Sequence, residues 1–274
     1  MIRTASIIFA AGRGTRMTGY EGNKTLLPLI PAKSPYEGAR PLIREVLDNL
    51  PPGPRAIVVN YLEEEVRRAT GGHGISYIRQ PVTNGTGGAL LAARPFLDST
   101  DADWVIITMG DVPFIRSATY GRLLELLGRC DLALLAFECG DRANYGMIET
   151  EGERVTKIVE WKYWKEFSAE RQGRLKYCNA GVYAVRKAAL LTYMDRMARR
   201  PHEVRKMLDG KWVTIKEYFL TDLAEMMNGD GLLVGMTSAP AREAIGVDSP
   251  ESLKAAQELY ASLAANGAKN AGTA

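Results

Sequence analysis

A short apolar segment near the start of the chain ends abruptly in two closely spaced glycines and two arginines. Residues 5–9 read Ala-Ser-Ile-Ile-Phe, and residues 10–17 read Ala-Ala-Gly-Arg-Gly-Thr-Arg-Met. A short apolar run predicts a buried strand, and a glycine-rich turn after it marks the carboxyl end of a strand in an open α/β sheet. The segment therefore predicts both a sheet class and the edge of the sheet where a ligand would bind.

The turn at residues 10–17 has the composition of an anion-binding loop. Gly12 and Gly14 can adopt positive φ and bring backbone N–H groups close to an anion. The guanidinium groups of Arg13 and Arg16 can form bidentate hydrogen bonds with phosphate oxygens. The loop has neither the Gly-Lys-Ser/Thr of a Walker motif nor the third glycine of the dinucleotide fingerprint. A tight strand-to-helix turn with exposed basic residues explains the loop equally well, so the loop alone leaves its ligand open.

The overall composition indicates a globular protein and excludes several partners. A chain of 274 residues can bury a large core, and its net charge of +3 is too small to indicate nucleic acid or a membrane surface. Cys130, Cys139 and Cys178 form no CxxC pair and predict reduced thiols. The apolar run after Arg3 is too short, and is followed too soon by Arg13, for a signal peptide. We expect a cytoplasmic protein with no nucleic-acid or membrane partner.

Strand-like and helix-like segments alternate through the first half of the chain. Strands are expected at 5–9, 56–60, 75–78 and 104–108, and helices at 41–50, 62–69 and 85–97. This alternation predicts a Rossmann-like, mainly parallel mixed sheet flanked by helices, the α/β class. Residues 20–39 are polar and proline-rich and predict a long loop across the mouth of the site.

The second half predicts shorter strands of mixed direction. Strands are expected at 132–138, 145–148, 155–159 and 182–185, and helices at 117–127, 190–200 and 220–227. Ser249-Pro250-Glu251 predicts the start of a final helix that ends at Gly267. We expect a single domain over residues 1–267, with halves at 1–112 and 113–248, a C-terminal helix at 249–267 and a flexible tail at 268–274.

Two carboxylates are candidates for a metal site. Asp111 directly follows the most apolar strand, and Asp248 precedes the final helix. Mg²⁺ takes one or two carboxylates together with substrate phosphates and water. Aspartate is also a common turn residue, and each position in isolation fits a plain turn or helix cap.

Other polar residues fit a nucleoside or a sugar but also fit structural roles. Gln80 and the glycines at 85–88 suit the flat edge of a base, or a flexible helix start. His73 and His202 occur in no metal-ligand pattern, and we expect both at the surface. The aromatic segment 161–164 favours packing, with Lys162 kept as a phosphate candidate.

The order of these motifs resembles the sugar-1-phosphate nucleotidyltransferases. The matching segments are Ala-Ala-Gly-Arg-Gly-Thr-Arg-Met at 10–17, Lys24, Gly-Thr-Gly-Gly-Ala at 85–89, Gly-Asp-Val-Pro at 110–113, Tyr-Gly at 145–146, Ile-Val-Glu at 158–160, Asn-Ala-Gly-Val-Tyr at 179–183, Glu-Tyr-Phe-Leu-Thr-Asp at 217–222 and Gly-Val-Asp at 246–248. The Tyr-Phe-Leu-Thr-Asp element further resembles the uridylyltransferase half of bifunctional N-acetylglucosamine-1-phosphate uridylyltransferase/glucosamine-1-phosphate acetyltransferase. The resemblance implies the nucleotide-diphospho-sugar transferase fold.

The resemblance also implies a role for each matching residue. Those implied to act in catalysis are Arg16, Lys24 and Asp111. Those implied to bind the nucleotide are Ala10, Ala11, Gly12, Gly14, Thr15, Gln80, Gly85 and Thr86. Those implied to contact the sugar are Gly146, Glu160, Asn179 and Thr221, and the implied Mg²⁺ ligands are Asp111 and Asp248.

The implied reaction is Mg²⁺-dependent transfer of a uridylyl group from UTP to a sugar 1-phosphate, with N-acetylglucosamine 1-phosphate favoured. Gly88 stands where the family usually has a histidine, Asp248 where it usually has an asparagine, and the acetyltransferase half is absent. These departures leave open which nucleobase and which sugar the protein uses. The alternatives are another NTP, a phosphorylated alcohol as acceptor, or a non-catalytic nucleotide-sugar sensor on the same fold.

Overall fold

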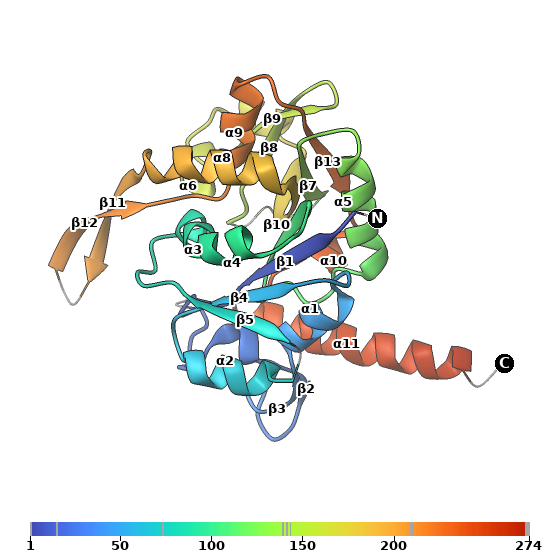
Figure 1. Ribbon diagram of the computed structural model, residues 1–274. Coiled ribbons are helices and arrows are strands. Elements are labelled where there is room, and N and C mark those ends of the chain that lie inside the picture. Colours follow the sequence, from blue (N-terminus) through green and yellow to red (C-terminus); the bar gives the residue numbers. More distant parts are fainter. Residues whose placement is uncertain are drawn as a thin grey trace.

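A nine-stranded mixed sheet forms the centre of the structure, with the strand order β13-β7-β10-β6-β1-β4-β5 and with β8 and β9 joined through β10 (Figure 1). The computed structural model describes residues 2–14, 16–72, 74–138, 140, 142, 144–208 and 211–271. The strands of this sheet are β1 (Thr4–Phe9), β4 (Arg55–Val59), β5 (Ile75–Arg79), β6 (Trp104–Met109), β7 (Leu132–Phe137), β8 (Met147–Glu151), β9 (Arg154–Val159), β10 (Tyr177–Arg186) and β13 (Val234–Ser238).

The first half of the sheet is parallel and the second half is mixed, as the sequence predicts. β1 pairs in parallel with β4 and with β6, and β4 pairs in parallel with β5. β10 runs antiparallel to β6, β7 and β8. The helices are α1 (Leu42–Asn49), α2 (Glu63–Thr70), α3 (Thr86–Ala92), α4 (Arg94–Ser99), α5 (Ser117–Leu127), α6 (Trp161–Trp164), α7 (Ala169–Arg174), α8 (Lys187–Ala198), α9 (Asp222–Gly229), α10 (Ala241–Ala244) and α11 (Pro250–Ala271).

Alternating side chains of β1 enter two separate cores, one on each face of the sheet. Ile7 and Phe9 pack with residues of α3, α4, α8 and α9, whereas Ile8 packs with residues of α1, α2 and α5. Successive side chains of a strand point to opposite faces, so a strand that is apolar throughout must be covered on both. The predicted Rossmann-like α/β class, with helices on both faces, is confirmed.

The segment 20–39, expected to be a long loop, is largely ordered against the last helix. It contains a short 3-10 helix, η1 (Lys24–Leu26), and the antiparallel hairpin β2 (Pro28–Pro31) and β3 (Gly38–Pro41). Leu27 and Leu29 form a third small core with Leu253 of α11, and the Gln257 amide donates to the carbonyls at positions 28 and 35. The prolines, which favour a loop in isolation, are accommodated because both strands of this two-stranded sheet are edge strands.

Several other boundaries differ from the sequence-based expectation. The helix expected at 85–97 is divided into α3 and α4 at Ala93, with Pro95 in the first turn of α4. The final helix begins as expected, with Ser249 Oγ accepting from the Ser252 N–H at 3.2 Å, but it continues past Gly267 to Ala271. Part of the expected tail is therefore helical, and residues 272–274 lie outside the described range.

One antiparallel hairpin was not predicted and extends from the body of the molecule. It consists of β11 (His202–Leu208) and β12 (Lys211–Glu217), and Figure 1 shows it projecting on the side opposite to α11. Trp212 is 60% exposed on it.

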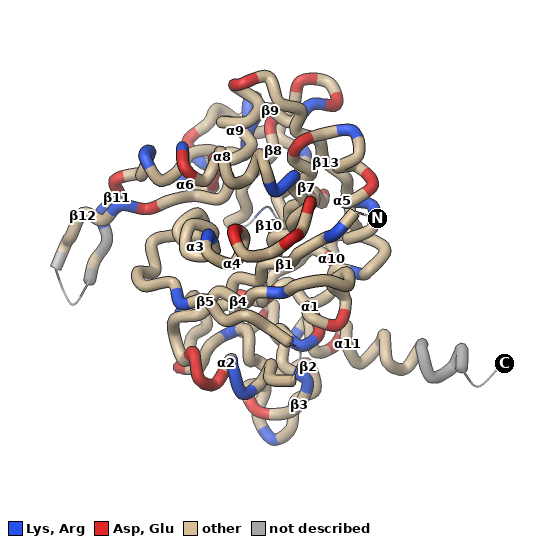
Figure 2. Tube along the Cα trace, viewed as in Figure 1, with Lys and Arg blue, Asp and Glu red and all other residues tan. Residues whose placement is uncertain are grey.

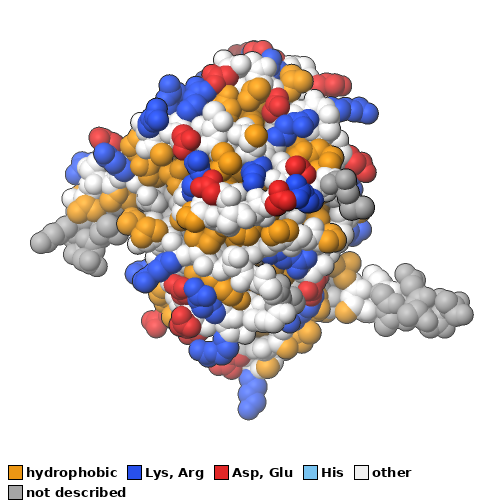
Figure 3. All heavy atoms as spheres, viewed as in Figure 1, with side chains coloured by type: hydrophobic (Ala, Val, Ile, Leu, Met, Phe, Trp, Pro, Cys, Tyr) orange, Lys and Arg blue, Asp and Glu red, His pale blue; other side chains and the backbone are white. Residues whose placement is uncertain are grey.

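Acidic and basic residues are interspersed along the trace and over the face seen in the space-filling view (Figures 2 and 3).

Gly53, just before β4, allows that strand to lie against the start of β1, which leads into the glycine loop. Its φ is 142°, and a Cβ atom there would lie 2.0 Å from the carbonyl oxygen of Thr4. We expect Gly53→Ala to lower the free energy of unfolding by about 2 kcal/mol or more, because both the backbone conformation and the contact oppose a side chain. Urea unfolding measures the change.

Gly121→Ala is the matched control for this substitution. Gly121 lies inside α5, and no atom lies within 4 Å of its built Cβ. Alanine there should be neutral or slightly stabilising because glycine weakens a helix. Equal unfolding curves for the two variants would contradict the assigned role of Gly53.

Candidate active site

The polar residues that follow β1 and β6 meet at one edge of the sheet. The two strands pair in register, Phe9 opposite Met109, and the Gly110 N–H donates to the Phe9 carbonyl at 2.9 Å. Asp111 therefore leaves the sheet beside the glycine loop. Its carbonyl accepts the Val247 N–H at 2.8 Å, which brings Asp248 to the same place.

A cavity of about 210 Å³ lies at this edge. Eight residues predicted for the site line it: Arg16, Lys24, Thr86, Asp111, Glu160, Asn179, Thr221 and Asp248. The remaining predicted residues that the structure describes lie outside its lining: Ala10, Ala11, Gly12, Gly14, Gln80, Gly85 and Gly146. Thr15 is outside the described residues, as are His73 and Cys139.

The glycine loop has the geometry of an anion cradle. Among the described residues, no backbone hydrogen bond uses the N–H groups of Ala11, Gly12 or Gly14. Gly14 has φ 65°, and a Cβ there would lie 3.1 Å from Lys24 Cβ, so the loop passes directly over that lysine. Arg13 lies over the ring of Tyr61, 5.4 Å from its centroid, and does not line the cavity. The free N–H groups could therefore bind an anion, with Arg16 as the nearer arginine.

Asn23 anchors the lysine to this loop and was not recognised from the sequence. Its side chain is fully buried, and its Nδ2 donates to the carbonyls of Ala10 at 2.9 Å and Tyr61 at 2.8 Å. Its Oδ1 accepts from the N–H and the hydroxyl of Thr25, at 3.1 and 2.8 Å. A buried amide with four partners fixes the chain on either side of Lys24. Asparagine before a 3-10 turn was the available signal, because asparagine is a preferred helix N-cap.

Two cation–carboxylate pairs occupy the floor and the rim of the cavity. Lys24 pairs with Asp111 where both side chains are mostly buried, and Arg16 Nη1 lies 2.7 Å from Asp248 Oδ2 in a more exposed position. The four charges sum to zero, so a polyphosphate that draws both cations would leave two carboxylates free. Two carboxylates beside phosphate oxygens are the ligands that Mg²⁺ prefers. No cluster of three or more histidine, cysteine or acidic residues that could hold a metal occurs among the described residues.

Polar residues gather on the other side of the cavity. The Thr221 hydroxyl donates to Glu160 Oε1 at 2.7 Å. Asn179 Nδ2 donates to the Tyr183 hydroxyl at 2.7 Å, and the Asn179 N–H donates to the Gly146 carbonyl at 2.8 Å. Neighbouring hydroxyl, amide and carboxylate groups can hydrogen-bond the hydroxyl groups of a sugar.

A bulge in β10 places Asn179 in this group. The register between β10 and β7 shifts between Asn179 and Tyr183, and Gly181 within the shift has φ 72° and donates its N–H to Asn179 Oδ1 at 3.1 Å. Bulges of this kind redirect side chains beside functional sites. Tyr183, which the sequence analysis did not select, lines the cavity below Asn179, and burial raises the pKa of its phenol.

The loop before α3 is tied to the segment after β12 by three hydrogen bonds. The Tyr218 N–H donates to the Asn84 carbonyl at 2.9 Å, and the Gly87 N–H donates to the Tyr218 carbonyl at 2.8 Å. The Leu220 N–H donates to Thr86 Oγ1 at 3.2 Å. Gly85 has φ 95°, and a Cβ there would lie 2.4 Å from the Tyr218 oxygen. The glycine is therefore required by this contact, whatever ligand binds.

Two expectations about individual residues need revision. His202, expected at the surface, is partly buried: its Nε2 lies 2.8 Å from Asp222 Oδ2, and its ring contacts that of Phe219. Burial raises the pKa of Asp222, and the histidine partly offsets this shift. Lys162, kept as a phosphate candidate, lies over the Phe219 ring at 4.4 Å and does not line the cavity.

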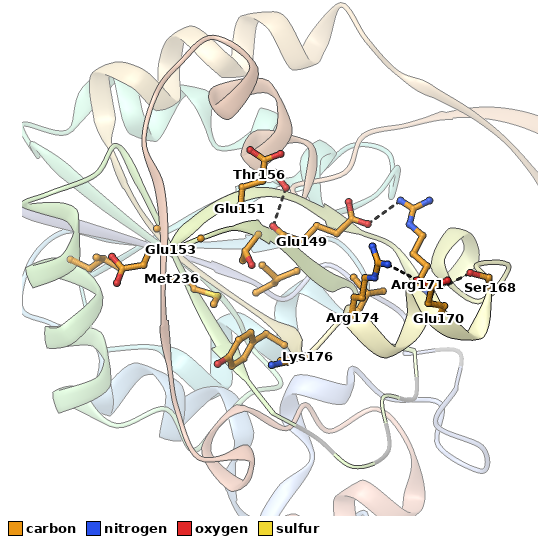
Figure 4. Close-up of a pocket in the computed structure, with 17 residues that line it drawn as sticks. Glu149, Glu151, Glu153, Thr156, Ser168, Glu170, Arg171, Arg174, Lys176 and Met236 are labelled. Carbon is orange, nitrogen blue, oxygen red and sulfur yellow. Dashed lines mark hydrogen bonds and ion pairs between the residues drawn. The ribbon is translucent and has the colours of Figure 1, made fainter.

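A larger cavity, of about 990 Å³, lies beside β8, β9 and α7 (Figure 4). Arg171 points toward Glu149 there, with 2.9 Å between Nη2 and Oε1, and Lys157 Nζ lies 3.4 Å from the same carboxylate. None of the residues predicted for catalysis or binding lines this cavity. The smaller cavity is the candidate active site, because eight of the predicted residues line it.

The sequence of the chain matches the family model of the MobA-like NTP transferase domain over residues 6–214. The chain belongs to this family. It is a nucleotidyltransferase. One relative, the bifunctional protein GlmU of Ruegeria sp. (strain TM1040), is 31% identical to this NTP transferase domain over 262 residues, or 94% of its length. The match covers 53% of the relative, so the chain spans about half the length of such relatives.

Solved structures share the fold of this NTP transferase domain at low sequence identity. A CMP:2-keto-3-deoxy-manno-octonic acid synthetase complexed with CTP superimposes with a TM-score of 0.63 at 16% identity, covering 95% of the domain and 99% of that chain. HddC from Yersinia pseudotuberculosis, complexed with GMP-PN, gives 0.61 at 18% identity, with coverage of 93% and 99%. The predicted nucleotide-diphospho-sugar transferase fold is confirmed. No described helix combines the length and apolar character needed to cross a membrane.

Asn23→Ala removes the anchor of Lys24 and leaves buried backbone groups without partners. We expect the free energy of unfolding to fall by about 2–4 kcal/mol, because each unsatisfied buried group costs about 1–3 kcal/mol. Asn49→Ala is the control: Asn49 also donates to a backbone carbonyl, but within its own helix. Urea unfolding separates the two, and an equally small loss for both variants would contradict the assigned role of Asn23.

Proposed function

We propose that this nucleotidyltransferase transfers a uridylyl group from UTP to a sugar 1-phosphate, with N-acetylglucosamine 1-phosphate as the favoured acceptor. The products are a UDP-sugar and pyrophosphate. The observation that carries the proposal is that two cation–carboxylate pairs and several polar side chains line one cavity, beside a glycine loop whose N–H groups make no backbone hydrogen bond among the described residues. The Tyr-Phe-Leu-Thr-Asp element at 218–222 supports the uridylyl choice by its resemblance.

The proposed reaction needs no nucleophile from the protein. A phosphate oxygen of the sugar 1-phosphate attacks the α-phosphorus of the nucleotide, a new P–O bond forms, and the bond to the pyrophosphate breaks. Lys24 and Arg16 neutralise the developing charge, and the loop N–H groups orient the phosphates. Glu160, Asn179 and Thr221 hold the sugar so that its phosphate faces the nucleotide. Catalysis is then mainly positioning and charge neutralisation.

Asp111 and Asp248 would hold Mg²⁺ in this proposal. The bound ion supplies charge neutralisation and a template for the phosphates. The donor set fits this ion, because both groups are carboxylates and both lie beside the cations that would bind the same phosphates. Loading of the nucleotide would require the phosphates to compete with these carboxylates for Lys24 and Arg16.

We expect Asp111→Asn to reduce pyrophosphate release by about a thousandfold or more while the fold stays intact, because a neutral amide holds a divalent cation poorly. The assay is pyrophosphate release over a grid of NTPs and sugar 1-phosphates, with and without Mg²⁺, beside a circular dichroism spectrum. The control is Asp101→Asn, at an aspartate whose side chain is 84% exposed and does not line the cavity.

Each outcome of the grid decides between the candidate functions. Turnover restricted to UTP supports the proposal, whereas turnover with CTP alone would assign a different nucleotide on the same site. If the wild-type protein released no pyrophosphate with any combination of NTP and sugar 1-phosphate, a nucleotide-sugar sensor would be favoured instead. Normal turnover by Asp111→Asn would overturn the metal assignment.

Arg16 and Arg13 belong to the same loop and give a matched comparison. We expect Arg16→Ala to lower kcat about 100-fold or more, as the loss of one preorganised donor does in other sites. Arg13→Ala should stay near the wild-type rate, because that guanidinium lies over Tyr61 instead of lining the cavity. Steady-state kinetics with saturating substrates measures both, and equal losses would contradict the division of roles.

A further inference from the structure

Gln80, the implied base reader, is held rigidly at the end of β5. Its backbone N–H donates to the Val59 carbonyl at 2.9 Å, and its carbonyl accepts from Asn60 Nδ2 at 2.7 Å. The residue is 3% exposed. Its amide Nε2 lies 3.2 Å from Asn84 Oδ1 and 3.2 Å from the Gly85 carbonyl oxygen. Both N–H bonds of the amide nitrogen therefore have partners.

These contacts determine which atom of the Gln80 amide a ligand meets. A backbone carbonyl can only accept, so the atom that faces Gly85 must be the amide nitrogen. Among the described residues, Oε1 has no hydrogen-bond partner, and it is not one of the buried atoms closed off from solvent. Gln80 thus offers an acceptor, and no donor, to whatever binds beside it.

Gly88 provides the space that Asn84 occupies. A Cβ atom at position 88 would lie 1.8 Å from Asn84 Oδ1 and 3.1 Å from Gln80 Nε2. The position is inside α3, where alanine would favour the helix more than glycine does. A histidine, which the resemblance leads one to expect there, would displace the Asn84 amide. Gly88 and Asn84 therefore form one unit with Gln80.

We propose that Asn84 is a positioning residue that fixes the Gln80 amide with its oxygen toward the nucleobase and so favours uracil over cytosine. The inference rests on the proposed function. The N3 position of uracil is an N–H donor and pairs with the Gln80 oxygen, whereas N3 of cytosine is an acceptor. Two acceptors that face each other leave both unpaired, which a buried site does not tolerate. Without Asn84, the amide nitrogen keeps only its contact with the Gly85 carbonyl, so the orientation of the amide is held less strongly.

The test compares kcat/KM for UTP and for CTP, with one sugar 1-phosphate, in the wild type, Asn84→Leu and Asn84→Asp. Leucine has similar size but no acceptor, and we expect it to lower the UTP-to-CTP ratio about tenfold or more. The KM for the sugar phosphate should not change. Aspartate keeps an oxygen that accepts from Gln80 Nε2 and should retain the wild-type preference.

The outcomes separate the inference from the function on which it rests. An unchanged ratio in Asn84→Leu, or a wild-type preference for CTP, overturns the inference but leaves nucleotidyl transfer in place. A wild type that turns over no NTP overturns the proposed function. Loss of activity with both nucleotides to the same extent would assign Asn84 a purely structural role and would also overturn the inference.

A double-mutant cycle tests the contact without any assay of activity. Gly88→Ala alone should lower the melting temperature, because the new methyl group displaces Asn84 from Gln80. In the Asn84→Ala background the same change should be neutral or stabilising, because the space is free and alanine favours the helix. Additive shifts in melting temperature would overturn the proposed Asn84–Gly88–Gln80 unit.

Discussion

The in-register pairing of β1 with β6 is the constraint on which the site depends. Both strands are buried on two faces and end at the same level, Phe9 opposite Met109. A shift of one residue would turn every side chain of the strand to the other face, so both cores hold the register. The glycine loop and Asp111 leave the sheet together as a result. The Gly110 N–H bond to Phe9 extends this register one step beyond the strands.

The site compensates its charges internally. Lys24 with Asp111, and Arg16 with Asp248, form neutral pairs that require no ligand for stability. Removing one partner of the mostly buried Lys24–Asp111 pair would leave a charge uncompensated and shielded from water. The same change in the more exposed Arg16–Asp248 pair would leave a charge that water can solvate. Asn23 keeps the lysine in place by binding the backbone of two separate loops. The electrostatics and the backbone around the cavity are thus parts of one arrangement.

Much of the architecture could be predicted because it follows from local apolar runs. The segments that became β1, β4, β6 and β7 are nearly continuous in apolar residues, and a run of that kind has few alternatives to a buried strand. The motifs could be selected by their order along the chain, and the fold brings eight of the residues they predicted to the lining of one cavity.

The failures have a common physical cause. The hairpins β2–β3 and β11–β12 were missed because many of their residues are exposed, and because prolines in the first and charged residues in the second obscure the apolar alternation of a strand. Asn23 and Tyr183 were missed for a related reason. Asn23 acts through the carbonyl of Tyr61, which is distant in sequence, and the contact of Tyr183 with Asn179 depends on the bulge in β10, which no local pattern reveals.

Three hydrogen bonds join residues 84–87, which include two residues proposed to bind the nucleotide, to residues 218–220, which directly precede Thr221, proposed to bind the sugar. A substrate that ordered one segment would also order the other, so the loss of conformational entropy in both segments would accompany the first binding step. In the proposed function, the second substrate would then bind a site that is already ordered, and its affinity would rise without any contact between the two ligands. Two of the three hydrogen bonds use the backbone of Tyr218 and the third uses the Thr86 hydroxyl, so none depends on the side chain at position 218. The two segments are distant in sequence, yet the free energies of the two binding steps would be coupled through these hydrogen bonds.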